Sequence, residues 1–291
     1  MKLTFLLIAP MLTFVAHAGA VFTSANASTA AGLQPAIDAF RASIGGGTVS
    51  GANGSFGGVR REVNWDGVPD NFADTSLMPA TFFVNNSPRG LGMSGPVNGF
   101  MVSANPGQPT AALFESFDGA AQGNNTYDFH AFSQSRVFSA IGGTDYDFSM
   151  FIPGNGFANP TFTLAFGLIF VDNTNSTFPL CASMTAFNGA TSLGFRCANS
   201  TTAGGFSFLG VTATGADVIT KVTIHQGNAQ LGTAQDSTHD VVVIDDLIYA
   251  EPGLASLPGT TTPEPTTMLL TAAGIFALGL IGRTRSSSPI A

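Results

Sequence analysis

"DYDFSMFI" at residues 145–152 decides the fold, because apolar and polar side chains alternate along it. Residues 146, 148, 150 and 152 are Tyr, Phe, Met and Ile, whereas residues 145, 147 and 149 are Asp, Asp and Ser. Successive side chains of an extended strand point to opposite faces. This period of two therefore predicts a strand with one face in a core and the other in solvent.

Further short apolar runs, separated by Gly, Asn, Asp and Pro, lie on both sides of this strand. They are ATFFVN near Phe82, GFMVSA near Met101, SRVFSAI near Phe138, FTLAFGLIFV from Phe162, LCASMTAF from Leu180, TSLGFRCA from Thr191, FSFLGVTAT from Phe206, VITKVTIHQ from Val218 and DVVVIDDLIY from Asp240. No helix-sized segment separates them, so the pattern favours antiparallel pairing. We expect an all-β fold, a single antiparallel β-sandwich or jelly-roll-like domain over residues 21–252.

One short N-terminal helix precedes these runs. In LQPAIDAFRASIG (residues 33–45), the apolar residues Leu33, Ile37, Phe40 and Ile44 recur at spacings of four, three and four. That spacing places them on one helical face, and three glycines from residue 45 end the helix.

The N-terminus has the features of a secretory signal peptide over residues 1–20. Lys2 supplies the positive charge, residues 3–15 are apolar, and Ala16-His17-Ala18 is a small-residue cleavage site. Cleavage after Ala20 is the alternative site, and a retained membrane helix is the alternative fate. The signal predicts export.

The C-terminus predicts a single transmembrane helix after a linker at residues 253–262. Residues 266–282 carry no charge, and Arg283 and Arg285 follow them. Seventeen residues are just long enough to span a bilayer, while a buried core helix is the alternative from length alone. Basic residues directly after a span favour the cytoplasmic side, so the acidic domain is expected outside the cytoplasm.

Together with the span and the arginines, the triplet Pro263-Glu264-Pro265 resembles the PEP-CTERM sorting signal of exported bacterial proteins, here residues 263–287. The same segment is also called the ice-binding protein C-terminal domain. The resemblance implies an exosortase as partner, in a bacterium that makes exopolysaccharide. It further implies a membrane-anchored precursor whose processed domain ends at the cell surface or outside the cell.

The central region is similar to a group of uncharacterised bacterial secreted proteins. The similar stretches are AIDAFRASIG, RREVNWDGVPDNFAD, FFVNNSPRG, GLIFVDNTNST and VVVIDDLIYAEP, between Ala36 and Pro252. The resemblance implies one domain rather than two, and it brings no catalytic residues with it.

The charge balance argues against a nucleic-acid partner. Of ten Lys and Arg, Lys2, Arg283 and Arg285 lie in the two ends, which leaves seven; of eighteen Asp and Glu only Glu264 does, which leaves 17. The exported part therefore carries about ten net negative charges. Phosphates need a Lys or Arg face, whereas an acidic domain suits divalent cations.

Calcium is the one candidate cofactor, at EVNWDGVPD (residues 62–70). Glu62, Asn64, Asp66 and Asp70 occupy positions 1, 3, 5 and 9 of a calcium loop, and Gly67 follows the third ligand. Position 1 is Glu, and position 12 is Ala73 where the loop normally has a bidentate Glu. The alternative is a turn-rich connection in which Asp and Asn cap their own backbone.

Cys181 and Cys197 are expected to form a disulfide. They flank the hairpin signal Asn188-Gly189, and the export signal implies an oxidising compartment. A three-residue loop would place the two sulfurs on facing strands, whereas a two-residue turn shifts the register by one and spoils direct opposition.

No catalytic motif is evident. His130, His225 and His239 lack metal-ligand spacing, Ser94 lacks a nucleophile elbow, and the adjacent Asp245 and Asp246 are expected on opposite faces of a strand. We therefore expect a non-catalytic envelope or matrix protein that binds calcium or exopolysaccharide. One alternative is a carbohydrate-binding module, for which the available rings are Trp65, Tyr127, Tyr146 and Tyr249. The other is a glycan-active hydrolase with a spatially paired set of carboxylates.

Overall fold

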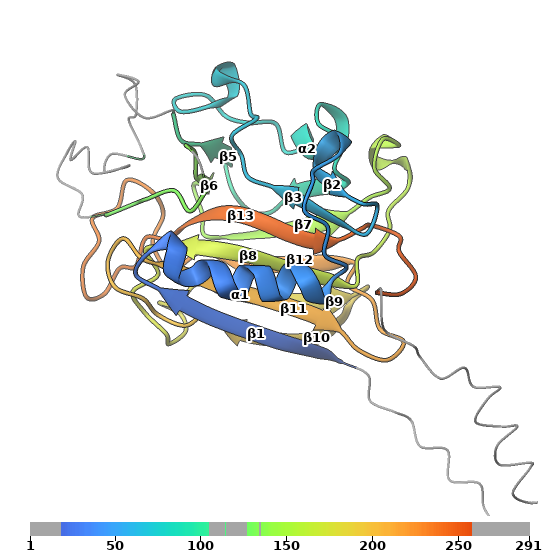
Figure 1. Ribbon diagram of the computed structural model, residues 1–291. Coiled ribbons are helices and arrows are strands. Elements are labelled where there is room, and N and C mark those ends of the chain that lie inside the picture. Colours follow the sequence, from blue (N-terminus) through green and yellow to red (C-terminus); the bar gives the residue numbers. More distant parts are fainter. Residues whose placement is uncertain (1–18, 105–113, 115–126, 134, 258–291) are drawn as a thin grey trace, which may run out of the picture. The chain divides into compact units, whose positions relative to one another are not determined.

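Two antiparallel sheets make up the fold, as the alternating runs predict. The computed structural model describes residues 19–104, 114, 127–133 and 135–257 (Figure 1). The predicted signal peptide, except for its last two residues, and the predicted sorting segment lie outside these residues. Among the helices that the structure describes, none is long and apolar enough to cross a membrane.

The larger sheet, sheet A, has the order β1-β11-β8-β13-β3-β2. In addition, β6 pairs with β13, and β5 pairs with β6. Its strands are β1 (Ala20–Ala27), β2 (Ser55–Phe56), β3 (Arg60–Val63), β5 (Gly99–Val102), β6 (Phe138–Ile141), β8 (Ala165–Val171), β11 (Phe206–Ala213) and β13 (Val243–Ala250).

The smaller sheet, sheet B, has the order β10-β9-β12-β7-β4. Its strands are β4 (Leu91–Ser94), β7 (Asp145–Met150), β9 (Ser183–Asn188), β10 (Thr191–Cys197) and β12 (Lys221–His225). The helices are α1 (Ala30–Ser43) and α2 (Phe82–Asn85), with short 3₁₀ turns at Ala52–Gly54, Asp70–Phe72 and Gly156–Ala158.

Strand β8 shows how one strand serves two cores. Its side chains at 166, 168 and 170 enter the main core between the two sheets, and those at 165, 169 and 171 enter a second core on the outer face of sheet A. The run is therefore apolar throughout although it alternates between faces. Sheet-on-sheet packing accounts for the first core, and a helix is needed to cover the second.

Helix α1 provides that cover (Figure 1). It begins after Thr29, whose side chain accepts a hydrogen bond from the Gly32 N–H at 3.1 Å. Leu33, Ile37 and Phe40 are buried as the helical spacing predicts, so the helix prediction is confirmed with a start three residues earlier.

The aromatic ring of Phe40 lies against two cross-strand glycines. Gly210 of β11 pairs directly with Gly167 of β8. A Cβ atom on Gly210 would lie 2.8 Å from the Phe40 ring, and one on Gly167 would lie 2.9 Å from it. The absence of side chains at this pair allows the helix to approach the sheet closely.

Two sequence predictions differ from the structure. The run ATFFVN forms the short helix α2 instead of a strand, and all three of its apolar residues, Phe82, Phe83 and Val84, are buried. A short apolar run cannot be assigned to strand or helix from periodicity alone. Strand β1 was not predicted; it begins at Ala20, one residue before the predicted domain start, and Ala20 pairs with Ala213.

The disulfide between Cys181 and Cys197 is present. The hairpin turn has two residues, because Asn188 pairs with Thr191, and a bulge near Leu193 shifts the register again. Cys197 consequently lies opposite Ser183, and the bond runs diagonally to Cys181 in the segment before β9.

Replacing Gly210 by Ala tests the contact between α1 and the sheet. The added methyl would overpack the Phe40 ring, so the free energy of unfolding should fall by about 1–3 kcal/mol in urea denaturation. Gly67→Ala is the control, because nothing lies within 4 Å of its Cβ position. Equal stabilities of the two variants would contradict the close approach of helix and sheet.

Candidate functional site

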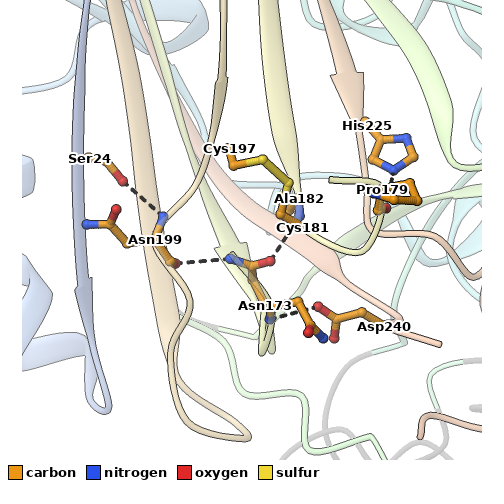
Figure 2. The surroundings of a disulfide bond; sticks show 10 residues. Ser24, Asn173, Pro179, Cys181, Ala182, Cys197, Asn199, His225 and Asp240 are labelled. Atoms are coloured by element: carbon orange, nitrogen blue, oxygen red, sulfur yellow. Dashed lines mark hydrogen bonds between the residues drawn. A yellow bond between two sulfur atoms is a disulfide. The ribbon is translucent and has the colours of Figure 1, made fainter. Parts of the chain in front are cut away.

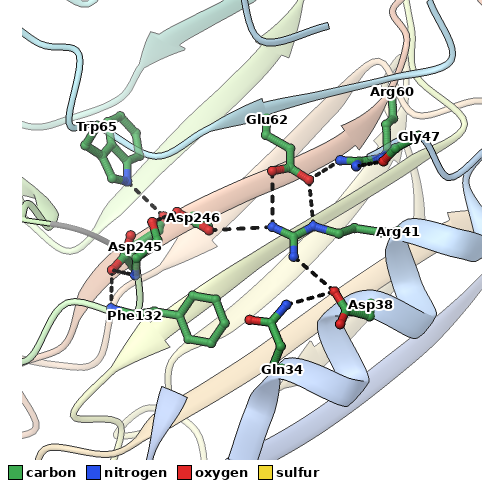
Figure 3. Close-up of polar contacts among 11 residues, drawn as sticks. Gln34, Asp38, Arg41, Gly47, Arg60, Glu62, Trp65, Phe132, Asp245 and Asp246 are labelled. Atoms are coloured by element: carbon green, nitrogen blue, oxygen red, sulfur yellow. Dashed lines mark hydrogen bonds and ion pairs between the residues drawn. The ribbon is translucent and has the colours of Figure 1, made fainter. Parts of the chain in front are cut away.

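A polar pocket of about 440 Å³ opens between α1, strand β3 and the loop before β2. Its lining residues are Arg41, Ser50, Gly51, Asn53, Gly54, Phe56, Glu62, Asn64, Arg89, Ser133 and Asp246. Pockets of this size accommodate small molecules, and convergent polar groups are what fix a ligand's orientation. Figure 3 shows the charged part of the lining and its neighbours.

Arg41 near the end of α1 is the centre of the charged cluster. Its Nε lies 2.7 Å from Glu62 Oε1 and its Nη2 lies 3.1 Å from Glu62 Oε2, a bidentate contact. Asp246 Oδ2 lies 3.9 Å from the same Nη2, and Asp38 binds Nη1 on the opposite side of the guanidinium at 3.2 Å (Figure 3). Burial lowers the pKa of Arg41, but the hydrogen bonds and charge of Glu62 more than offset this and raise it overall.

Glu62 also binds Arg60, two residues earlier on the same face of β3. Arg60 is buried and donates to the backbone carbonyls of Gly46 and Gly47 as well. Burial lowers the pKa of Arg60. The two arginines join the end of α1 and the loop after it to sheet A through one carboxylate.

A β-bulge in β13 brings two further carboxyls to this place. Ile244 pairs with Phe170 and Leu247 pairs with Leu168, so β13 has one residue more than β8 over this interval. Asp245 and Asp246 occupy the bulge, and both are buried. The prediction that they point to opposite faces is wrong, because a bulge breaks the alternation on which it rested.

The two carboxyls share their environment. Burial and the neighbouring charge of Asp246 raise the pKa of Asp245 well above its usual range. The backbone N–H groups of Phe132 and Ser133 donate to Asp245 Oδ2, and Oδ1 is buried without a hydrogen-bond partner among the described residues. Burial raises the pKa of Asp246 to about 6, although the Ser133 hydroxyl donates to it at 2.6 Å.

The predicted calcium loop forms a turn that carries Trp65 into the core. Trp65 has a positive φ of 65°, stacks on Phe138 with ring centroids 4.2 Å apart, and donates from Nε1 to the Asp245 carbonyl at 2.8 Å. The bulge and the turn therefore hold each other in place.

The predicted calcium ligands have separate protein partners. Glu62 binds Arg41 and Arg60, Asp66 Oδ1 accepts from the Ser135 N–H at 3.0 Å, and Asp70 binds Arg136. The side chain of Asn64 is exposed and lines the pocket. Among the described residues, no three His, Cys, Asp or Glu side chains form a group that could hold a metal ion. The calcium site stays a prediction.

Three lining side chains have no hydrogen-bond partner within the part of the chain that the structure describes. Ser50, Asn53 and Asn64 are exposed at the pocket, and no contact with another described residue occupies the hydroxyl or the two amides. Amide and hydroxyl groups both donate and accept, which suits a ligand rich in hydroxyls. The two carboxylates of the lining bind Arg41, whereas Ser50, Asn53 and Asn64 are available to a ligand.

The remaining candidates lie elsewhere. His225 contacts Asp145 and the Pro179 carbonyl, and His130 contacts Asp128. Trp65, Tyr127, Tyr146 and Tyr249 are at most 3% exposed, so none of them offers a ring to a sugar.

Arg41, Arg60 and Arg89 were not singled out from the sequence. The available signal for such arginines was the pair of adjacent aspartates in an otherwise apolar strand, VVVIDDLIY. Buried carboxyls require nearby hydrogen-bond donors or positive charges.

Compared with protein families, curated proteins and solved structures, the chain matches no family model, no curated protein and no solved structure. These comparisons lend no support to the resemblances of the C-terminal segment and of the central region, which stay predictions.

Asp246→Asn tests the environment of the bulge. Folded Asp246 retains a proton between about pH 4 and 6 that the unfolded chain has lost, so this proton stabilises the fold at low pH and the benefit disappears as pH rises towards 6. One such proton changes the free energy of unfolding by up to about 1.4 kcal/mol per pH unit. The stability of Asp246→Asn relative to wild type should therefore rise from pH 4 to 6 and then level off.

The measurement is urea denaturation at closely spaced pH values. Stability curves of wild type and variant that stay parallel across this range would contradict the raised pKa of Asp246.

Proposed function

We propose that this protein is a non-catalytic, exported protein of the cell envelope or extracellular matrix whose β-sandwich domain binds exopolysaccharide in the polar pocket. One observation supports this class of ligand. The hydroxyl of Ser50 and the amides of Asn53 and Asn64 line the pocket without partners among the described residues, next to charged side chains that hold one another in place. Sugars present closely spaced hydroxyls, which such groups can bind from both sides of the pocket.

The two end segments of the chain account for its proposed export and membrane anchoring. The signal peptide directs export, the PEP-CTERM segment holds the precursor in the membrane with the domain outside, and an exosortase processes it. Of the two cleavage sites, the one after Ala18 suits the sheet better. The Thr214 N–H donates to the Gly19 carbonyl at 2.9 Å, the Gly19 N–H donates to the Thr214 hydroxyl at 3.2 Å, and Ala20 pairs with Ala213.

A glycan-active hydrolase is the second candidate, because Glu62 and Asp246 line one pocket and burial raises the pKa of Asp246 to about 6. A raised pKa suits a general acid. Against it, both oxygens of Glu62 bind arginines and Asp246 is only 3% exposed. These contacts favour binding over catalysis.

Pocket binding is tested with the full chain, solubilised in mild detergent, on a glycan array. Asn53→Ala and Asn64→Ala together should lower the affinity for a bound glycan about tenfold, since each removes hydrogen bonds of about 0.5–1.5 kcal/mol. The control is Asn159→Ala, at an exposed asparagine away from the pocket. Arrays in EDTA and in calcium show whether an ion at residues 62–70 takes part.

Two results separate the candidates. Release of reducing ends from a bound glycan, abolished by Asp246→Asn, would replace the binding proposal by the hydrolase. Unchanged binding by the double asparagine variant would move the ligand away from this pocket.

The sorting signal is tested in a host that contains an exosortase. Replacing Pro263, Glu264 and Pro265 by alanines should leave a full-length, membrane-held protein, because the enzyme would lose its recognition triplet. Immunoblots of membrane and extracellular fractions measure this. Processing at the wild-type rate would refute the sorting interpretation.

A further inference from the structure

Arg89, which lines the polar pocket, forms no ion pair with a carboxylate among the described residues. Its Nε donates to the backbone carbonyl of Glu62 at 3.0 Å, and its Nη1 binds the Ser87 hydroxyl. Both acceptors are neutral, so neither compensates the charge. Nη2 makes no hydrogen bond within the described part of the chain. A guanidinium has about five N–H donors, so most of those of Arg89 are available to a ligand.

The other described arginines show that this is unusual. Each of those that is not exposed forms an ion pair: Arg41 and Arg60 with Glu62, Arg61 with Glu251, and Arg136 with Asp70. Arg196 likewise has no carboxylate partner among the described residues, but it is exposed and water can solvate its charge. Buried charges in proteins are normally paired. Arg89 is the exception, and it lies where a ligand can reach it.

The side chain of Arg89 is held in place before any ligand binds. Besides its two hydrogen bonds, its guanidinium lies 5.4 Å from the centroid of the buried Phe83 ring. The backbone at Gly54 packs against it, because a Cβ atom there would lie 2.7 Å from Arg89 Nε. Burial lowers the pKa of Arg89, and the like charge of Arg61 lowers it further. An anion at this preorganised fork would compensate a charge that the protein itself leaves unpaired.

The charges around the pocket favour a carboxylate over a phosphate. A phosphate monoester carries about 1.5 to 2 negative charges at neutral pH. The charge in excess of that of Arg89 would be repelled by Glu62 and Asp246, which line the same pocket. A carboxylate carries one charge, and its two oxygens match the arginine fork. The amides of Asn53 and Asn64 suit hydroxyls on the same ligand.

We propose that the polar pocket binds uronic acid units of the exopolysaccharide, with the carboxylate at Arg89 and the hydroxyls at Asn53 and Asn64. The inference rests on the proposed function of this pocket and names the class of sugar that it recognises. A neutral glucan supplies hydroxyls alone and would leave Arg89 unpaired.

Trigalacturonate and its uncharged methyl ester are the probes, titrated calorimetrically into the full chain in mild detergent. Wild type should bind the acid about 10- to 100-fold more tightly than the ester, which is the range for hydrogen bonds to charged groups. Arg89→Gln should lower the affinity for the acid by the same factor and leave that for the ester unchanged. Arg89→Lys should keep part of the preference, because it retains the charge without the planar fork.

Arg196→Gln is the matched control, since Arg196 also lacks a carboxylate partner among the described residues and lies outside the pocket. It should leave the preference for the acid intact. Arg89→Gln also removes the hydrogen bond to the Glu62 carbonyl, so melting curves accompany the titrations. If that variant does not fold, Arg89→Lys and the comparison of acid and ester on wild type decide.

Equal binding of acid and ester by wild type would overturn the inference, as would a preference for the acid that both Arg89 variants retain. Glucuronate and glucose 6-phosphate, used as competitors, separate a carboxylate from a phosphate on the same ring. Stronger displacement by glucose 6-phosphate would assign Arg89 to a phosphate, and tighter binding of triglutamate than of trigalacturonate would assign it to a peptide. Either result would replace the uronic acid.

The proposed function of the pocket can fail independently of this inference. Binding of the uncharged ester depends on hydroxyl contacts alone, so the Asn53/Asn64 double variant should weaken it whatever the role of Arg89. An ester that the double variant binds as tightly as wild type would contradict hydroxyl recognition in the pocket. Weakened binding of the ester, without any preference for the acid, would remove only the uronic acid.

Discussion

The extra residue in β13 is the constraint on which the site depends. A strand that is buried on both faces must keep its alternation in phase with its neighbours, and a one-residue shift moves every later side chain to the other face. In this protein the shift occurs at Asp245 and Asp246, and after it Leu247 and Tyr249 enter the core between the sheets while Ile248 enters the core under α1. The bulge allows β13 to contribute side chains to both cores. It also places the carboxyls of Asp245 and Asp246 near the end of α1.

Burying those carboxyls is unfavourable by itself, because transfer of an ionised carboxylate out of water costs several kcal/mol even after relaxation. The structure offsets this with backbone donors from Phe132 and Ser133 and with Arg41. An apolar pair of similar volume would avoid the cost, so a purely structural explanation of the aspartates is incomplete. The position of Asp246 on the wall of a polar pocket, with Asp245 buried beside it, is what a functional explanation requires.

The sandwich was predictable because each strand carries its own signal in the local sequence. The alternation in β7 and the turn residues between runs required no knowledge of the tertiary structure, and the period of α1 marked its buried face. The candidate site was not predictable in the same way. Arg41, Glu62 and Asp246 lie far apart in the chain, and only the bulge and the pairing of β3 with β13 bring them together. The acidic spacing at residues 62–70 suggested one shared ion, yet its members turn to different partners because Trp65 enters the core between them.

Different contacts hold the polar pocket and the disulfide-bearing edge of sheet B in place. At the pocket, Arg41 and Arg60 occupy the carboxylate of Glu62, and neutral amides and a hydroxyl lie beside it. At the disulfide-bearing edge of sheet B, the Cys181–Cys197 bond and buried Asn173 fix the backbone (Figure 2). The arrangement at the pocket favours a ligand recognised through its hydroxyls.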